Sequence, residues 1–208
     1  MKVQSALTVG ETLPKTFLLA VEARGDQPAI REKRFGIWKS VSWREWLQTT
    51  KEVSYALDAI GFEPGDVASI LSNTVAQWLY ADMGVLCAGG ASSGSYPTDS
   101  AKQVEYLVND SRTKVIFVED DEQLDKVLEC RGRCPTLQKI VVFDMEGLSA
   151  FSDPMVVSLD AFLTSGRQHM VGHEGLWEQM VNARGPKDLA ILVYTSGTTG
   201  PPKGAMHT

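Results

Sequence analysis

Apolar and polar residues alternate along this chain in two rhythms, one typical of helices and one typical of buried strands. In residues 43–60 the apolar positions recur mainly at three- and four-residue spacing, which indicates a helix with one face on a core. Ser42 and Glu45 stand three residues apart at its start, the arrangement of a capping box, and Gly61 ends it. The mostly apolar run from Val67 to Leu71 then predicts a buried strand.

The same alternation continues to the end of the chain. Further helices are predicted at 16–24, 75–87 (capped by Asn73 or Thr74), 101–109 (capped by Ser100), 121–129 and near 174–183. Further strands are predicted at 114–118, 139–143 and 188–194, with a small-residue strand or loop from 91 to 97, and a hairpin from 27–32 and 35–41 that turns at Lys33–Arg34. The rest of 146–186 is expected to form surface excursions. Strands separated by helices predict an α/β fold with a mostly parallel sheet and flanking helices.

The charge balance narrows the classes of partner. The chain has 208 residues, with 26 Asp and Glu against 20 Lys and Arg and a formal net charge of −6. Nucleic acid selects surfaces rich in Lys and Arg, so we expect no nucleic-acid partner. No apolar stretch reaches the roughly 18 residues that a transmembrane helix needs. The first residues lack the apolar core of a signal peptide, so we expect a cytoplasmic protein with reduced cysteines.

Three groups of side chains resemble metal sites only superficially. Cys130 and Cys134 are four residues apart, but no second pair of zinc ligands accompanies them. His169 and His173 have the same spacing, but a glycine lies between them and no carboxylate completes a metalloprotease motif. The acidic run at 119–122 is better explained as the start of a helix, where carboxylates complement the macrodipole. We therefore expect no metal at any of the three.

The segment with the clearest chemistry follows the last predicted strand. After Tyr194 come Thr-Ser-Gly-Thr-Thr-Gly at 195–200, then Pro-Pro-Lys-Gly at 201–204. Glycines let a backbone approach an anion closely and turn its N–H groups inward. Four hydroxyl groups can bind phosphate oxygens or Mg²⁺, and Lys203 supplies a compact positive charge. These residue types in this order predict a polyphosphate-binding loop.

Two other interpretations of this segment are weaker. A plain turn after a core strand is the simpler one, but six successive Thr, Ser and Gly residues followed by Pro-Pro-Lys-Gly make a longer pattern than a turn needs. A Walker A loop requires its lysine directly after the final glycine. Here Lys203 precedes Gly204, so the Walker pattern does not fit.

Residues 194–204 closely resemble the signature loop of the adenylate-forming (AMP-dependent synthetase and ligase) superfamily. Three upstream segments are similar to family motifs and occur in the family order: Val41–Trp46, Leu86–Ala91 and Tyr106–Ser111. Within the superfamily, Phe35–Trp38 and Tyr96–Thr98 look most like bacterial long-chain acyl-CoA synthetases. The resemblance covers most of the chain and is weakest over 146–186.

The resemblance implies a fold, a reaction and a set of site residues. The chain would be the amino-terminal part of the large domain of an enzyme that activates a long-chain fatty acid with ATP to acyl-AMP and then transfers it to coenzyme A. Mg²⁺ would assist, with Thr195 as its ligand. The implied phosphate-binding residues are Thr195, Ser196, Gly197, Thr198, Thr199, Gly200 and Lys203.

The chain departs from the family pattern in one respect. It stops at Thr208, before the family's aromatic-Gly-x-Thr-Glu segment, its ribose-binding Asp, and its mobile carboxyl-terminal domain with the catalytic lysine. We expect residues 1–208 to be a truncated, partial AMP-binding domain without the carboxyl-terminal lid, without catalytic residues, and unable to make acyl-adenylate alone. The alternative is a non-enzymatic module that binds nucleotide phosphates or a partner chain. Peripheral membrane contact stays open.

Overall fold

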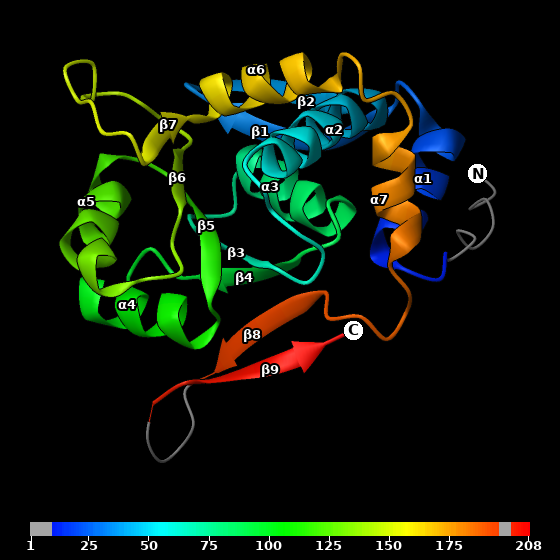
Figure 1. The fold of residues 1–208 in the computed structure, drawn as a ribbon. Helices are drawn as coiled ribbons and strands as arrows, with labels where there is room; N and C mark the ends of the chain where they lie inside the picture. Colours follow the sequence, from blue (N-terminus) through cyan, green and yellow to red (C-terminus); the bar gives the residue numbers. More distant parts are fainter. Residues whose placement is uncertain (1–9, 196–200) are drawn as a thin grey trace.

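A seven-stranded sheet organises the chain, and a separate two-stranded hairpin stands beside it (Figure 1). The computed structural model describes residues 10–195 and 201–208. The strand order is β7-β6-β5-β3-β4-β8-β9, and all neighbours are parallel except β8 and β9. The strands are β3 (Val67–Leu71), β4 (Ala91–Ser95), β5 (Thr113–Val118), β6 (Lys139–Val142), β7 (Val156–Ser158), β8 (Ile191–Thr195) and β9 (Lys203–His207). The predicted α/β class and mostly parallel sheet are confirmed.

Helices cover both faces of this sheet. They are α1 (Leu13–Arg24), α2 (Trp43–Ala59), α3 (Ala76–Cys87), α4 (Ala101–Asp110), α5 (Asp121–Cys130), α6 (Leu159–Met170) and α7 (Leu176–Ala183), with a 3₁₀ turn at Arg131–Arg133. Ile70, Phe117 and Val141 pack with α2, α3 and α6, whereas their neighbours Leu71 and Ile116 pack with α4 and α5. Successive strand residues point to opposite faces, so the central strands β3, β5 and β6 are apolar on both sides.

Local signals in the sequence account for several element boundaries. The Ser42 hydroxyl accepts a hydrogen bond from the Glu45 backbone N–H at 3.2 Å, and the Glu45 carboxylate accepts one from the Ser42 N–H at 2.7 Å. Ser100 and Gln103 form the same reciprocal pair at the start of α4. Gly61, with φ of +78°, follows the end of α2 in a conformation that favours glycine. The capping box predicted at Ser42 and the cap predicted at Ser100 are confirmed, and the structure adds the Gln103 half of the second box.

Buried hydroxyl groups interrupt the apolar layers near the middle of the sheet. The Ser69 hydroxyl on β3 lies 2.6 Å from the Thr113 hydroxyl on β5, which in turn lies 2.7 Å from the Ser111 hydroxyl. The Ser111 hydroxyl donates onward to the Leu107 carbonyl at the end of α4. Buried polar groups are costly unless paired, and this chain of contacts pairs all three hydroxyls.

The structure corrects three predictions about element positions. Residues 146–186 contain β7 and the twelve-residue α6 as well as the predicted last helix, and β9 was not predicted. The hairpin strands are β1 (Pro28–Arg34) and β2 (Ile37–Ser42), so the turn lies at Phe35–Gly36, where both residues have positive φ. Positive φ at both residues gives the strands the twist that a two-residue hairpin requires. The turn therefore lies two residues beyond the predicted one at Lys33–Arg34.

Two predicted polar roles also change. Neither Asn73 nor Thr74 caps α3, whose N-cap is Val75 without a side-chain hydrogen bond. The Asn73 backbone and side-chain N–H groups instead donate to the Glu119 carboxylate, which also accepts from the Ser72 hydroxyl. The acids at 120–122 do begin α5, as predicted, with Asp120 accepting from the Gln123 N–H.

Helix α6 reaches α2 through a glycine. Any Cβ on Gly166 would collide with the backbone carbonyl of Glu52, so only glycine permits this close crossing. An ion pair of 2.7 Å between Arg167 and Glu52 stabilises the edge of this crossing. Further along, the His169 ring nitrogen lies within hydrogen-bond distance of the Asp58 carboxylate, at 2.8 Å. Glycine weakens intrinsic helix propensity, which explains why α6 was not predicted.

We predict that Gly166→Ala lowers the free energy of unfolding by about 2–3 kcal/mol, because α6 must move away from α2 to accommodate the methyl group. Gly132→Ala is the matched control, since a Cβ there meets no atom within 4 Å and Gly132 has no positive φ. Urea unfolding of both variants measures the difference. Equal stability of the two variants would show that the α2–α6 crossing is not as close as described.

Candidate functional site

The predicted phosphate loop lies at the tip of the β8–β9 hairpin. Thr195 ends β8 and Lys203 begins β9, and the two residues are cross-strand partners. Both are exposed. Ser196, Gly197, Thr198, Thr199 and Gly200 fall outside the described residues, so their predicted roles stay predictions. The structure thus brings the two ends of the motif, the hydroxyl of Thr195 and the ammonium of Lys203, to adjacent positions at the base of one loop.

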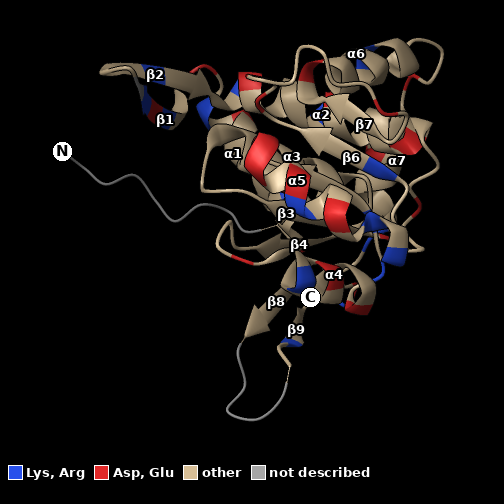
Figure 2. Ribbon diagram, turned by 90° about the vertical axis from the view of Figure 1, so that its left-hand side faces the viewer, with Lys and Arg blue, Asp and Glu red and all other residues tan. Residues whose placement is uncertain are grey.

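The tip of the hairpin lies at the carboxyl edge of the parallel strands. Strand β8 runs parallel to β4, with Ser92 opposite Ile191 and Ser93 opposite Leu192, so their carboxyl ends point the same way. In open α/β sheets, ligands bind outside this edge. Figure 2 shows β8 and β9 extending beyond the helical layers, which leaves the loop base accessible.

Two cavities flank this edge and share Gly94, Tyr96 and Tyr194 in their linings. One, of about 480 Å³, lies between α4 and the hairpin and also includes Lys102, Tyr106 and Pro202. The other, of about 370 Å³, lies towards α3 and includes Asn73, Trp78 and Ile191. Aromatic and apolar walls with a few polar groups are typical of small-molecule sites. Open space therefore lies on both sides of the strand that enters the loop.

Two tyrosines connect the hairpin to helix α4. The Tyr106 hydroxyl donates to the Pro202 carbonyl at 2.8 Å, on the segment that returns from the loop. The Tyr194 hydroxyl donates to the Asp110 carboxylate at 2.7 Å. Burial raises the pKa of Tyr194 above its usual range, and the hydrogen bond to Asp110 raises it further, so the phenol stays protonated at neutral pH.

Gly204 has a packing role beside these two tethers. Its cross-strand partner is Tyr194, and a Cβ on Gly204 would lie 3.0 Å from the tyrosine ring. A larger residue at this position would therefore displace the ring that reaches Asp110. This explains physically why a glycine follows the lysine of the motif.

Sequence reasoning predicted the loop but not the residues that hold the strands on either side of it. Tyr106 lies on the helix predicted at 101–109 and Asp110 directly follows it, about 90 positions before the loop, and nothing local in the sequence connects either residue to the loop. Their one available signal is the resemblance of residues 106–111 to a family motif. Lys203 begins β9, and within the described ranges no ion pair engages it.

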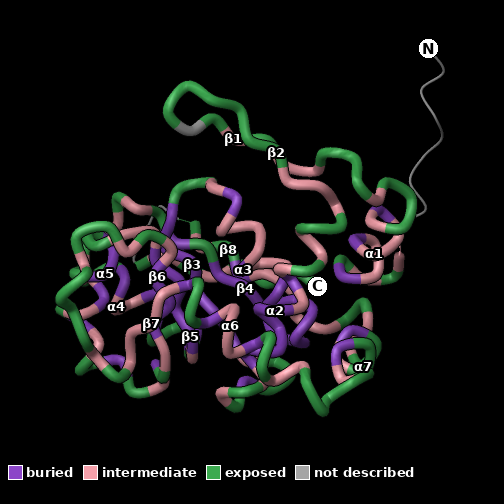
Figure 3. Tube along the Cα trace, turned by 90° about the horizontal axis from the view of Figure 1, so that it is seen from above, coloured by how far each residue is buried: buried purple, intermediate pink, exposed green. Residues whose placement is uncertain are grey.

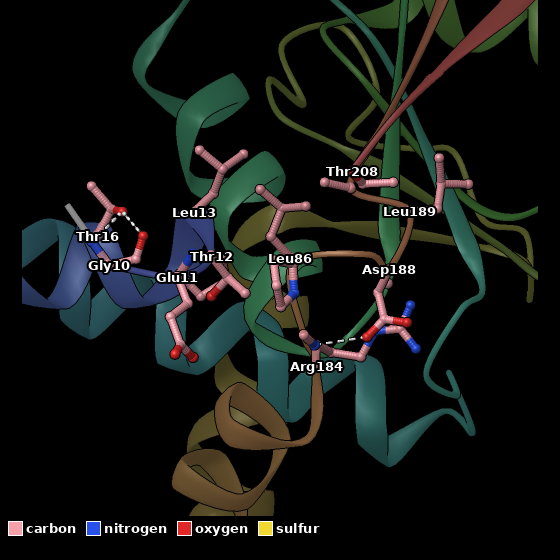
Figure 4. Close-up of a pocket in the computed structure, with 15 residues that line it drawn as sticks. Gly10, Glu11, Thr12, Leu13, Thr16, Leu86, Arg184, Asp188, Leu189 and Thr208 are labelled. Atoms are coloured by element: carbon pink, nitrogen blue, oxygen red, sulfur yellow. Dashed lines mark hydrogen bonds and ion pairs between the residues drawn. The ribbon is translucent and has the colours of Figure 1, made fainter.

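A third cavity, of about 270 Å³, lies at the opposite end of β8 (Figure 4). Its lining includes Glu11 and Asp188, and its arginine, Arg184, is paired with Asp188 at 3.4 Å. Two carboxylates and a neutralised cation make it unsuited to a polyphosphate. The electrostatics thus favour the loop end of the hairpin over this cavity.

The superficial metal motifs have structural roles. Cys130 and Cys134 are buried, and burial raises the pKa of the Cys130 thiol to about 12, so it is not a thiolate at neutral pH. His169 pairs with Asp58, and the His173 ring contacts the His169 carbonyl at 2.8 Å. Within residues 10–195 and 201–208, no three His, Cys, Asp or Glu side chains gather as a metal site. None of the helices in this part is long and apolar enough to cross a membrane.

Comparison with protein families gives one match that covers most of the chain. A family model described as "AMP-binding enzyme" matches residues 17–208. Curated relatives include the long-chain-fatty-acid–CoA ligase ACSBG1 of Bos taurus, 29% identical over 94% of this chain and 26% of its own length. The long-chain-fatty-acid–CoA ligase ACSBG2 of Homo sapiens is 29% identical over 94% of this chain and 28% of its own length. The chain spans little more than a quarter of these relatives.

Solved structures with the same fold are adenylate-forming enzymes. The A-PCP didomain of a carboxylic acid reductase from Segniliparus rugosus, in complex with AMP, has a TM-score of 0.78 at 20% identity, covering 95% of this chain and 32% of that one. The anthranilate CoA ligase AuaEII, in complex with anthranoyl-AMP, has a TM-score of 0.69 at 20% identity, covering 92% of this chain and 33% of that one. At this identity the likeness shows the fold alone.

The tethers make a testable prediction about the hairpin. Tyr106→Phe removes one hydrogen bond to Pro202, worth about 1 kcal/mol, so the amide hydrogens of residues 203–207 should exchange about fivefold faster. Tyr96→Phe is the control, because Tyr96 lines the same cavity and its exposed hydroxyl has no hydrogen-bond partner among the described residues. Exchange followed by mass spectrometry measures both. Unchanged protection in Tyr106→Phe would contradict the tether.

Proposed function

This chain belongs to the AMP-binding enzyme family, and on that premise we propose that it forms the phosphate-binding part of an AMP-forming acyl-CoA ligase. The observation that supports this most directly is the pairing of Thr195 with Lys203 across the base of the β8–β9 loop. A hydroxyl and a cation without an ion pair among the described residues thus lie together at the carboxyl edge of the sheet. The names of the curated relatives favour a long-chain fatty acid as the substrate.

The proposed reaction has two steps. A carboxylate oxygen of the fatty acid attacks the α-phosphorus of ATP, the bond from that phosphorus to the bridging oxygen breaks, and pyrophosphate leaves. The thiol of coenzyme A then loses its proton and attacks the acyl carbonyl, and AMP leaves. Negative charge develops on the β- and γ-phosphates in the first step, so donors fixed around those phosphates lower the barrier.

Each described residue of the loop base has a role in this proposal. The ammonium of Lys203 would contact a phosphate oxygen as a point charge, and the hydroxyl of Thr195 is the proposed oxygen ligand for Mg²⁺. A hydroxyl oxygen suits this hard cation, which usually keeps several waters and binds mainly through substrate phosphates. When bound, Mg²⁺ would neutralise phosphate charge. Ser196 to Gly200 would wrap the phosphates with backbone N–H groups.

The tethers serve this function by fixing the loop base. Catalytic phosphate contacts must be positioned before reaction, because an ordered site costs no reorganisation when charge develops. Tyr106 holds the returning segment at Pro202, and Tyr194 holds the entering strand against Asp110. We place no catalytic residue in this chain. Its contribution is binding and orientation.

We predict that Lys203→Ala weakens binding of MgATP by about tenfold to a hundredfold, because a hydrogen bond to a charged group is lost. Binding of AMP, which lacks the β- and γ-phosphates, should change far less. Isothermal titration of the full chain with each nucleotide measures the two effects.

Lys187→Ala is the matched control for this experiment. Lys187 is also an exposed lysine near β8, but it precedes the strand, at the end away from the loop. The control should bind both nucleotides like the parent chain. Equal losses for ATP and AMP in Lys203→Ala, or the same loss in Lys187→Ala, would contradict a specific role of the loop in holding the triphosphate.

A further inference from the structure

The β1–β2 hairpin carries three exposed apolar side chains at its tip, and one of them, Phe35, is the most exposed large apolar side chain of the described residues. Phe35 is 102% exposed, Ile37 66% and Trp38 65%. Figure 3 shows the hairpin extending away from the body of the molecule, with most of its trace coloured as exposed. Isolated exposed apolar residues are ordinary, but three together on a projecting tip mark a surface that another phase or molecule covers.

The conformation of Phe35 strengthens this argument. Its φ is +49°, and Gly36 follows with φ of +81°, the pattern of a tight two-residue turn. Asn, Asp or Gly normally occupies the first of these positions, because a side chain is strained at positive φ. An aromatic residue at this position is unfavourable for the hairpin itself, and the side chain of Phe35 is fully exposed rather than packed against the described residues, so it is best explained by something outside the fold.

Charge distinguishes the tip from the rest of the molecule. Residues 28–42 contain four Lys and Arg and one Glu, a formal charge of +3 in a chain of −6, which leaves −9 for the remainder. Lys33 lies directly opposite Trp38 in the register, so a cation and an aromatic side chain share one face next to the turn. A negatively charged surface would therefore attract this arm and repel the body, which orients the molecule tip-first.

The arm is fixed firmly to the body at its other end. The backbone N–H of Trp43 donates to the Gln27 carbonyl, and Arg44 forms an ion pair of 2.9 Å with Asp26. Trp43 packs in turn against Phe17 of α1 and Trp46 of α2. The hairpin is thus held as a projection from the α1–α2 junction, and its tip can reach a surface without bringing the acidic body into contact.

We propose that the β1–β2 tip docks on an anionic lipid membrane. Phe35, Ile37 and Trp38 insert at the headgroup level, where aromatic side chains are favoured, and Lys33 and Lys39 contact lipid phosphates. Alternating long cationic and apolar side chains suit this interface, because the stems can lie in apolar surroundings while the charges stay in water. The proposal is independent of which carboxylic acid the ligase activates.

The test uses co-sedimentation of the full chain with phosphatidylcholine vesicles that do or do not contain phosphatidylglycerol. The parent chain should bind the anionic vesicles and bind the neutral ones less. The triple variant Phe35→Ser, Ile37→Ser, Trp38→Ser should lose at least about tenfold in partitioning. The double variant Lys33→Gln, Lys39→Gln should lose the preference for anionic vesicles, and high salt should have the same effect on the parent.

The control variant is Val171→Ser, which removes an apolar side chain that is 78% exposed after α6 and should bind like the parent. All substituted side chains are exposed, so circular dichroism should show unchanged folding. The proposal is overturned if the parent does not bind anionic vesicles, or if the triple variant binds them equally well. It is also overturned if the triple variant differs from the parent only in its molecular mass by sedimentation without vesicles. That result would identify a second copy of the chain as the occupant of the tip.

Discussion

The position of the β8–β9 hairpin, whose strands flank the predicted phosphate loop, depends on a short stretch of parallel pairing between β4 and β8. Only Ser92 and Ser93 of β4 are register partners of β8, opposite Ile191 and Leu192, and the Ser92 N–H donates to the Ala190 carbonyl. A small apolar cluster of Val67, Ala91 and Leu192 lies beneath this seam. Few backbone contacts therefore join the hairpin to the sheet, which explains why the tyrosine tethers from α4 matter. They hold the hairpin from a second direction.

Helices packed on both faces of the central sheet stabilise the scaffold that supports the β8–β9 hairpin. Strands β3, β5 and β6 are apolar on both faces and are covered by α2, α3 and α6 on one side and by α4 and α5 on the other. Covering both faces leaves the carboxyl edge as the open part of the sheet, and Thr195, Lys203, the two tyrosines and the two flanking cavities all lie there. Ligand binding then carries little entropic cost of ordering the scaffold, because the scaffold is already ordered.

The sequence predicted those parts of the fold that local chemistry determines. Val67–Leu71 was identified to the residue because an apolar run between a Gly-Asp turn and a polar loop has one simple interpretation. The capping box at Ser42 and the cap at Ser100 were also correct. Strand β9 could not be found, because its residues become a strand only by pairing with β8. Helix α6 was hidden because Gly166 is a packing requirement imposed by α2, a partner more than a hundred residues earlier.

The candidate site divides in the same way. Residue types alone indicated polyphosphate at 195–204, since few ligands need that density of hydroxyls and glycines beside a lysine. The contacts that position the loop, from Tyr106 to Pro202 and from Tyr194 to Asp110, link residues 96 and 84 positions apart and follow only from the packing of α4 beside the hairpin.

The hydroxyl chain from Ser69 through Thr113 to Ser111 has a consequence for folding fidelity. Neighbouring apolar strands such as β3 and β5 would lose little burial by sliding two residues past one another, since the same faces would still meet the helices. Such a slide would separate Ser69 from Thr113 and strand at least one hydroxyl in an apolar layer, at a cost of about 1–3 kcal/mol. These three small side chains therefore favour a single register between β3 and β5, the two strands at the centre of the sheet on which β4 and then β8 pair.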